Sequence, residues 1–215
     1  MRNAIQKKHI DKAYDYKSFK KLVDDLLEEG RATSGNDSDM PLTEFTKLNV
    51  RRMSRIDKTL ELKDELKDEL RNLNDKWYWV VLAEGWCGDV SQNLPVIAKM
   101  AEASANIELK ILLRDQNLDV MDQYLTDGGR SIPKLICLEA DSLKELGTWG
   151  PRPEVLQKMV MEAKEKKDPD QPRKEWVDDI HEKMHKWYAD DKGETIQGEF
   201  IDLIKQWQAV EAESH

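Results

Sequence analysis

The sequence predicts an α/β fold with a helical extension at each end. Between residue 77 and about residue 164, short apolar runs alternate with segments of helical spacing, as in a sheet whose strands are joined by helices. Both flanking regions are highly charged and carry apolar residues at helical spacing. We therefore predict an N-terminal helical extension over residues 1–75, an α/β domain over 76–165, and a C-terminal helical extension over 166–215 that packs on the core.

The N-terminal extension is expected to contain several helices. Residues 17–29 have apolar side chains at intervals of three and four, and Gly30 follows, as glycine often does at a helix end. Residues 42–73 carry two apolar stripes, and the stripe changes register between Leu60 and Leu62. This change favours two joined helices over one long helix.

The central region supplies the strands. Residues 77–83 form a continuous apolar run, which is typical of a strand buried on both faces. Further strands are expected at 107–113, 135–138 and 143–148, the last two forming a hairpin. Helices are expected at 89–104 and 118–125, and a helix from about residue 153 is expected to close the unit.

The C-terminal extension predicts two helices, at residues 175–190 and 195–209. Their apolar residues form a stripe rich in aromatic side chains. Such stripes are more often core than partner surface, because large exposed aromatic patches are uncommon on soluble monomers. We expect the stripe to pack into the core.

The composition of the chain limits the classes of partner and cofactor that it is expected to bind. The net charge of −9 argues against nucleic acid and anionic membranes as partners. No segment is apolar enough to span a bilayer, and the first fifteen residues lack the apolar core of a signal peptide. With only two cysteines, the chain fits a reducing cytoplasm without a permanent disulfide. No motif calls for a cofactor, since Gly128-Gly129 precedes a strand and does not open a helix as a phosphate loop would.

The most informative motif is Trp86-Cys87-Gly88-Asp89-Val90-Ser91, which follows the first apolar run. A cysteine at a strand-to-helix turn faces the unpaired N–H groups and the positive end of the helix dipole. Both favour the thiolate, which is the nucleophilic form. Val90 stands where a dithiol redox site would carry its second cysteine.

Three local signatures resemble the thioredoxin superfamily. These are Trp86-Cys87-Gly88, Pro95 eight residues after the cysteine, and Ile132-Pro133 just before a strand. The resemblance covers roughly residues 77–164 and implies a thioredoxin-like fold with a central mixed sheet flanked by helices. It also implies that Cys87 is the nucleophile and that Ile132 and a cis Pro133 form a substrate platform facing it.

More narrowly, the chain resembles an uncharacterised bacterial thioredoxin-like family with a single-cysteine Trp-Cys-Gly-Asp motif. The resemblance extends to Arg114-Asp115 and to two glycine- and proline-containing segments, at residues 128–133 and 147–153.

The departures from thioredoxin bear on activity. Asp89 replaces the motif proline, Val90 replaces the second cysteine, and Val81 replaces the buried aspartate beneath the dithiol. The resulting hypothesis is a monothiol oxidoreductase that forms mixed disulfides with protein or low-molecular-weight thiols, with release by an external thiol. Cys137 lies inside an apolar strand and is expected to be an inert core residue.

Charges near Cys87 are expected to set its reactivity. Asp89 disfavours the thiolate, whereas Arg130, on the loop that should face the cysteine, and Arg152 could offset that effect. We expect a moderately lowered pKa for Cys87.

Alternatives remain open at this stage. The chain could be a redox-inactive interaction module, or a peroxide sensor in which Cys87 forms a sulfenic acid. His181-Glu182-Lys183-Met184-His185 matches the H-E-x-x-H zinc motif. Because a short charged helix produces such matches by chance, we predict no metal site.

Overall fold

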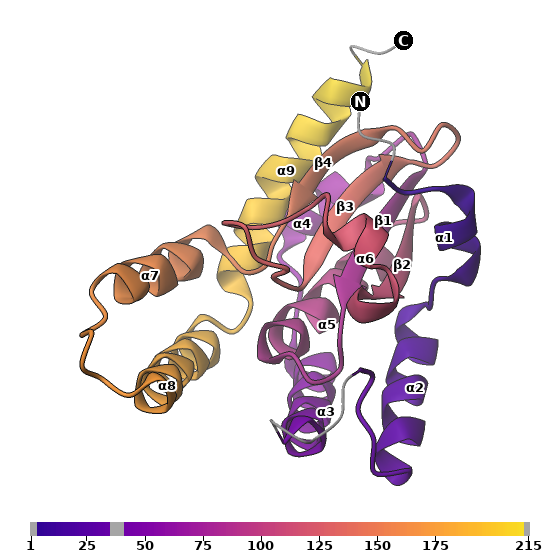
Figure 1. The fold of residues 1–215 in the computed structure, drawn as a ribbon. Helices are drawn as coiled ribbons and strands as arrows, with labels where there is room; N and C mark the ends of the chain where they lie inside the picture. Colours follow the sequence, from indigo (N-terminus) through magenta and orange to yellow (C-terminus); the bar gives the residue numbers. More distant parts are fainter. Residues whose placement is uncertain (1–3, 35–40, 213–215) are drawn as a thin grey trace.

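A four-stranded mixed sheet forms the centre of the molecule (Figure 1). The computed structural model describes residues 4–34 and 41–212. The strands are β1 (Trp77–Ala83), β2 (Ile107–Leu113), β3 (Lys134–Glu139) and β4 (Glu145–Trp149), in the order β2-β1-β3-β4. β1 pairs in parallel with β2 and antiparallel with β3, and β3 and β4 form an antiparallel hairpin. The predicted α/β fold with a mixed sheet is confirmed.

β1 is an inner strand of the sheet, with β2 on one side and β3 on the other. Six of its seven residues are buried, and Val81 is aligned with Ile111 of β2 on one side and Leu135 of β3 on the other. An uninterrupted apolar run suits such a position, since a strand covered on both faces exposes little of its side chains to water.

Helix α9 (Glu194–Ala212) covers the sheet face that carries Trp77 and Trp79. The Phe200 ring lies 5.1 Å from that of Trp79, and the Trp207 ring lies 6.2 Å from that of Trp77. Phe200 also lies 5.5 Å from the ring of Trp149 on β4. Much of the C-terminal aromatic stripe is therefore core, as expected.

The N-terminal helices pack against the sheet and against other helices. They are α1 (Lys7–Lys12), α2 (Tyr16–Glu28), α3 (Leu42–Thr59) and α4 (Asp64–Arg71). The helix break expected between Leu60 and Leu62 is confirmed, because both residues lie in the extended link between α3 and α4. α3 runs along α5 (Gly88–Glu102), and α4 packs against α9. Short α6 (Leu118–Met121) follows β2.

Helices α7 (Glu154–Glu165) and α8 (Arg173–Asp191) form a hairpin that projects to one side of the sheet (Figure 1). They share a small apolar cluster of their own, built on Leu156, Ile180, Met184 and Tyr188. The helix expected to close the α/β unit from about residue 153 is α7, yet the C-terminal helix that packs on the tryptophans of the sheet is α9. The physical reason is apolar surface: α7 buries only Leu156, whereas α9 buries a full face.

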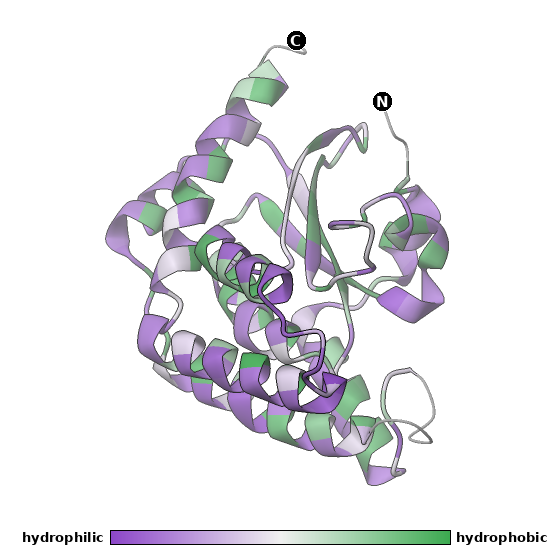
Figure 2. Ribbon diagram, turned by 60° about the vertical axis from the view of Figure 1, so that its left-hand side comes forward, coloured by the Kyte–Doolittle hydropathy of each residue, from purple (hydrophilic) through white to green (hydrophobic). Residues whose placement is uncertain are grey.

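Hydrophilic and hydrophobic residues are banded along the helices, as expected when each has one buried face (Figure 2). Within the described ranges, no helix combines the length and apolar character needed to cross a membrane.

Candidate active site

Cys87 is the N-cap residue of α5, at the end of the short link that follows β1. Its Sγ lies 3.3 Å from the backbone carbonyl oxygen of Ile132, to which the thiol donates. The Ile132–Pro133 peptide bond is cis. The structure therefore brings together Cys87 and the Ile132-Pro133 segment, which lie 45 residues apart in the sequence.

The thiol is the stable form of Cys87 in this arrangement. Burial, followed by the negative charge of Asp89, raises the pKa of Cys87 to about 12. The pKa is lowered by the backbone N–H groups of Val90 and Asp89 and by the charge of Arg152, but by less than burial and Asp89 raise it. The expected moderate lowering of the pKa is wrong, because burial destabilises the thiolate more than the N–H groups of the helix terminus stabilise it.

Asp89 is buried and fully engaged. Its carboxylate forms an ion pair with Arg152, whose Nε lies 3.0 Å from Oδ2, and it accepts a hydrogen bond of 2.7 Å from the Tyr188 hydroxyl. Asn93 in turn donates to the Tyr188 oxygen at 2.9 Å. This network ties the first turn of α5 to α8, and it reduces the charge that Arg152 presents to Cys87.

Trp86 is held from two sides. Its indole N–H donates to Ser34 Oγ at 2.9 Å, and the Arg114 guanidinium lies 4.9 Å from the centre of its ring. Arg114 also forms an ion pair of 2.7 Å with Asp115. The Arg114-Asp115 pair noted in the sequence thus supports the tryptophan of the cysteine motif.

Arg130 does not contribute to the charge around the cysteine. Its guanidinium makes two hydrogen bonds with exposed Asp122, of 2.6 and 2.9 Å. Arg152 is the arginine whose charge reaches Cys87. Val90 is buried in the first turn of α5, and Gly88 begins that helix.

A buried carboxyl group lies between β1 and the cysteine motif in the chain, at a position that sequence reasoning missed. Val81 is apolar core, whereas Glu84, three residues before Cys87, is completely buried. Glu84 accepts hydrogen bonds from the Thr33 hydroxyl and from the backbone N–H of Asp115 at 3.0 Å. Burial raises its pKa. The sequence signal that could have identified it is a glutamate directly after an apolar strand.

Arg52 and His185 were also missed, and both reach the start of α5. A Cβ built on Gly88 would lie 3.6 Å from His185 Cε1 and 3.9 Å from Arg52 Nη1. Burial and the charge of Arg52 lower the pKa of His185 to about 4, so the imidazole is neutral near pH 7. His185 belongs to the H-E-x-x-H match. In residues 4–34 and 41–212, no three His, Cys, Asp or Glu side chains are grouped to hold a metal ion.

Cys137 is buried in β3, opposite Trp79 of β1. Burial raises its pKa well above the ordinary value. Both properties fit an inert core residue and do not fit a resolving thiol.

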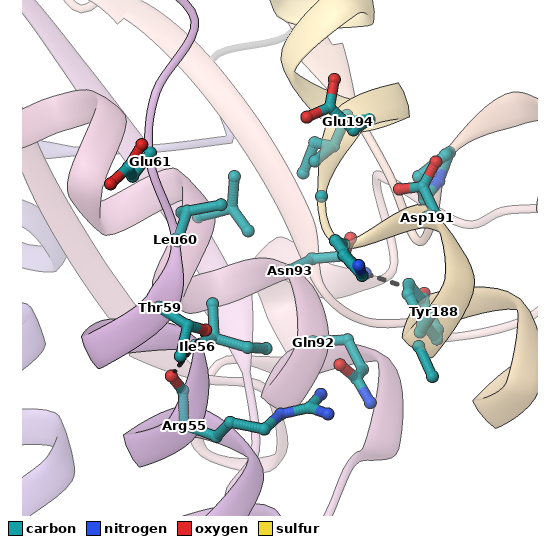
Figure 3. Close-up of a pocket in the computed structure, with 16 residues that line it drawn as sticks. Arg55, Ile56, Thr59, Leu60, Glu61, Gln92, Asn93, Tyr188, Asp191 and Glu194 are labelled. Carbon is teal, nitrogen blue, oxygen red and sulfur yellow. Dashed lines mark hydrogen bonds between the residues drawn. The ribbon is translucent and has the colours of Figure 1, made fainter.

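A cavity of about 450 Å³ lies between α3, α5 and the α8–α9 junction (Figure 3). Its walls include Ile56 of α3 and Leu60, which directly follows that helix, and Arg55 reaches across it toward Gln92 of α5. Asn93 and Tyr188, which belong to the Asp89 network, line it as well.

These features define a class: a thioredoxin-fold protein with one cysteine at the start of the helix that follows the first strand. A family model described as thioredoxin matches residues 35–166, more than half of the chain, and the chain belongs to this family. The match begins before the α/β domain and takes in α3 and α4. No curated protein matches the sequence.

Two solved structures share the fold over 93% of this chain and 96% of their own. One is a protein of unknown function, PA1234, from Pseudomonas aeruginosa, with 18% identity and a TM-score of 0.60. The other is an HIV epitope scaffold of the 4E10 series, with 17% identity and a TM-score of 0.56. At these identities the likeness concerns the fold alone.

Proposed function

We propose that the protein is a monothiol thiol–disulfide exchange protein with Cys87 as nucleophile. The observation that carries the proposal is the position of Cys87 at the N-cap of α5, with its thiol on the Ile132 carbonyl. A substrate in extended conformation that pairs with the Ile132 carbonyl would compete with the Cys87 thiol for this acceptor. Substrate binding would thereby free the sulfur.

The exchange needs two steps. The Cys87 thiolate attacks one sulfur of a disulfide, so that the substrate S–S bond breaks, a Cys87–S bond forms, and the other sulfur leaves as a thiolate that takes up a proton. An external thiol, as its thiolate, then attacks the substrate sulfur of this mixed disulfide. A new external disulfide forms, and the Cys87 thiolate leaves and is reprotonated. Because Val90 offers no second thiol, a compartment rich in reduced thiols, such as the cytoplasm, is part of the proposal.

Exposure to oxidised glutathione followed by intact-mass analysis tests the proposal. We expect one glutathione adduct on the folded wild-type chain and on a Cys137→Ala variant, and none on Cys87→Ser. Addition of reduced glutathione should remove the adduct. A folded protein that stays unmodified at Cys87 after prolonged exposure would contradict the proposal.

The raised pKa of Cys87 favours a second candidate, a redox-inactive interaction module. In that case a protein partner should bind Cys87→Ser as tightly as the wild type. Trp149 is unsuitable as a probe of such binding, because its ring packs in the core against Phe200 and its substitution would change stability as well as any contact with a partner.

A further inference from the structure

We propose that Arg52 and His185 form an anion-binding subsite beside Cys87, and that the substrates are low-molecular-weight disulfides carrying carboxylates. The inference rests on the proposed exchange activity and names its substrate class. It derives from the side chains that converge on Gly88, the residue after the nucleophile.

Both groups lie against Gly88, the residue that directly follows the nucleophile. Arg52 Nη1 and His185 Cε1 lie 3.9 Å and 3.6 Å from the Cβ position of Gly88, approaching from α3 and α8. A side chain at Gly88 would come into contact with both. Gly88 directly follows Cys87, so the two groups lie next to the nucleophile along the first turn of α5.

Arg52 differs from the other arginines around the site in its partners. Arg152, Arg114 and Arg130 each have a carboxylate within ion-pair distance. Arg52 is partly buried, donates to the Asn49 side-chain oxygen at 2.9 Å, and has no ion pair within the described ranges. The chain holds 43 acidic and 34 basic residues, so acidic groups are plentiful. A partly buried guanidinium without a counter-charge is costly, and an anionic ligand would compensate it.

His185 supplies a second, independent observation. Its Nδ1 is buried and has no hydrogen-bond partner among the residues that the structure describes. A buried polar atom normally has a partner, supplied by the protein, by water or by a ligand. As the Nδ1–H tautomer, the neutral ring would donate to a carboxylate oxygen beside the Arg52 guanidinium.

The neighbouring cavity favours a small ligand over a protein. Arg55 follows Arg52 by one turn of α3, and Gln92 follows Gly88 by one turn of α5. Both line the cavity of about 450 Å³, with Arg55 pointing toward Gln92 (Figure 3). This volume suits a molecule of roughly the size of a small peptide thiol.

The test compares three small symmetrical disulfides of different charge: dithiodipropionate (dianion), 2-hydroxyethyl disulfide (neutral) and cystamine (dication). The rate of adduct formation on Cys87 is measured by intact mass at one pH and ionic strength. We expect dithiodipropionate to react about tenfold or more faster than cystamine, since a carboxylate accepts charge-assisted hydrogen bonds from the subsite and an ammonium group cannot. High salt should reduce this preference in the wild-type protein.

Arg52→Gln should abolish most of the preference, and Arg52→Lys should retain part of it. Arg51→Gln, a change at the exposed neighbouring position, is the matched control and should preserve the preference. Equal rates for the three disulfides in the wild type would overturn the subsite while leaving the exchange activity in place. A preference that survives Arg52→Gln would overturn the role of Arg52. No adduct with any disulfide would contradict the exchange activity itself.

Discussion

The alkylation rate of Cys87 should still rise with pH well above the pH at which the rate of an ordinary cysteine levels off. A free cysteine has a pKa of about 8.5, and that of Cys87 is about 12. At pH 7 this difference leaves about 3,000-fold less thiolate. Each thiolate is more nucleophilic by about 30-fold, because nucleophilicity rises with pKa with a Brønsted slope of about 0.4–0.5. The expected net effect is a rate about 100-fold below that of a free cysteine.

The assay uses iodoacetamide and intact-mass detection on a Cys137→Ala variant between pH 6 and 11. The same chain unfolded in urea provides the reference and should show a midpoint near about 8.5. For the folded chain, we expect the rate to rise through pH 11 without a plateau. A plateau at or below the reference midpoint would refute the reasoning, because the helix terminus and Arg152 would then outweigh burial.

The same shift predicts a dependence of stability on pH. A group whose pKa is raised by folding stabilises the native state fully below its unfolded pKa and loses this contribution as pH rises toward its folded pKa. For Cys87 the loss begins near about pH 8.5 and reaches about 3 kcal/mol by pH 11, at 1.36 kcal/mol per pKa unit. Because the side chain is only partly buried, this is an upper bound. The difference in unfolding free energy between wild type and Cys87→Ser isolates it.

Three other substitutions test the surroundings of the site and the core. Asp89→Asn removes a charge that raises the pKa of Cys87, and it frees Arg152 from its ion pair. Alkylation of Cys87 at pH 7 should therefore accelerate about tenfold or more, while the free energy of unfolding falls by about 3–5 kcal/mol. An unchanged alkylation rate would contradict the electrostatic account. Phe200→Ala, at a completely buried ring, should cost about 3–5 kcal/mol in urea unfolding. Gly147→Ala places a Cβ 2.0 Å from Trp207 Nε1 and should cost about 1–3 kcal/mol, and a neutral result would mean that the indole moves freely.

Local patterns located the elements well because they depend on near neighbours in the chain. The apolar runs at residues 77–83 and 107–113 coincide with β1 and β2, and the register change between Leu60 and Leu62 marks the end of α3. The choice between α7 and α9 as the helix on the sheet could not be made in this way. Both are amphipathic, and the decision depends on which one fills the space over the tryptophans of β1.

The electrostatics of the site could not be predicted because they depend on partners distant in the sequence. Arg130 is paired with Asp122, and Arg152 is committed to Asp89, so neither acts as a free cation beside Cys87. The Tyr188 hydroxyl reaches Asp89 from 99 residues away. None of these pairings leaves a periodic signal.

The sequence by itself determined the fold class, the strands and the cysteine at the start of a helix, since hydrophobic periodicity and a short motif act over a few residues. Only the tertiary structure decided that Cys87 rests as a thiol on the Ile132 carbonyl, that Glu84 is completely buried, and that Arg52 and His185 meet at Gly88. Burial and charge at a site are sums over everything packed around it, and packing joins residues that the chain keeps far apart.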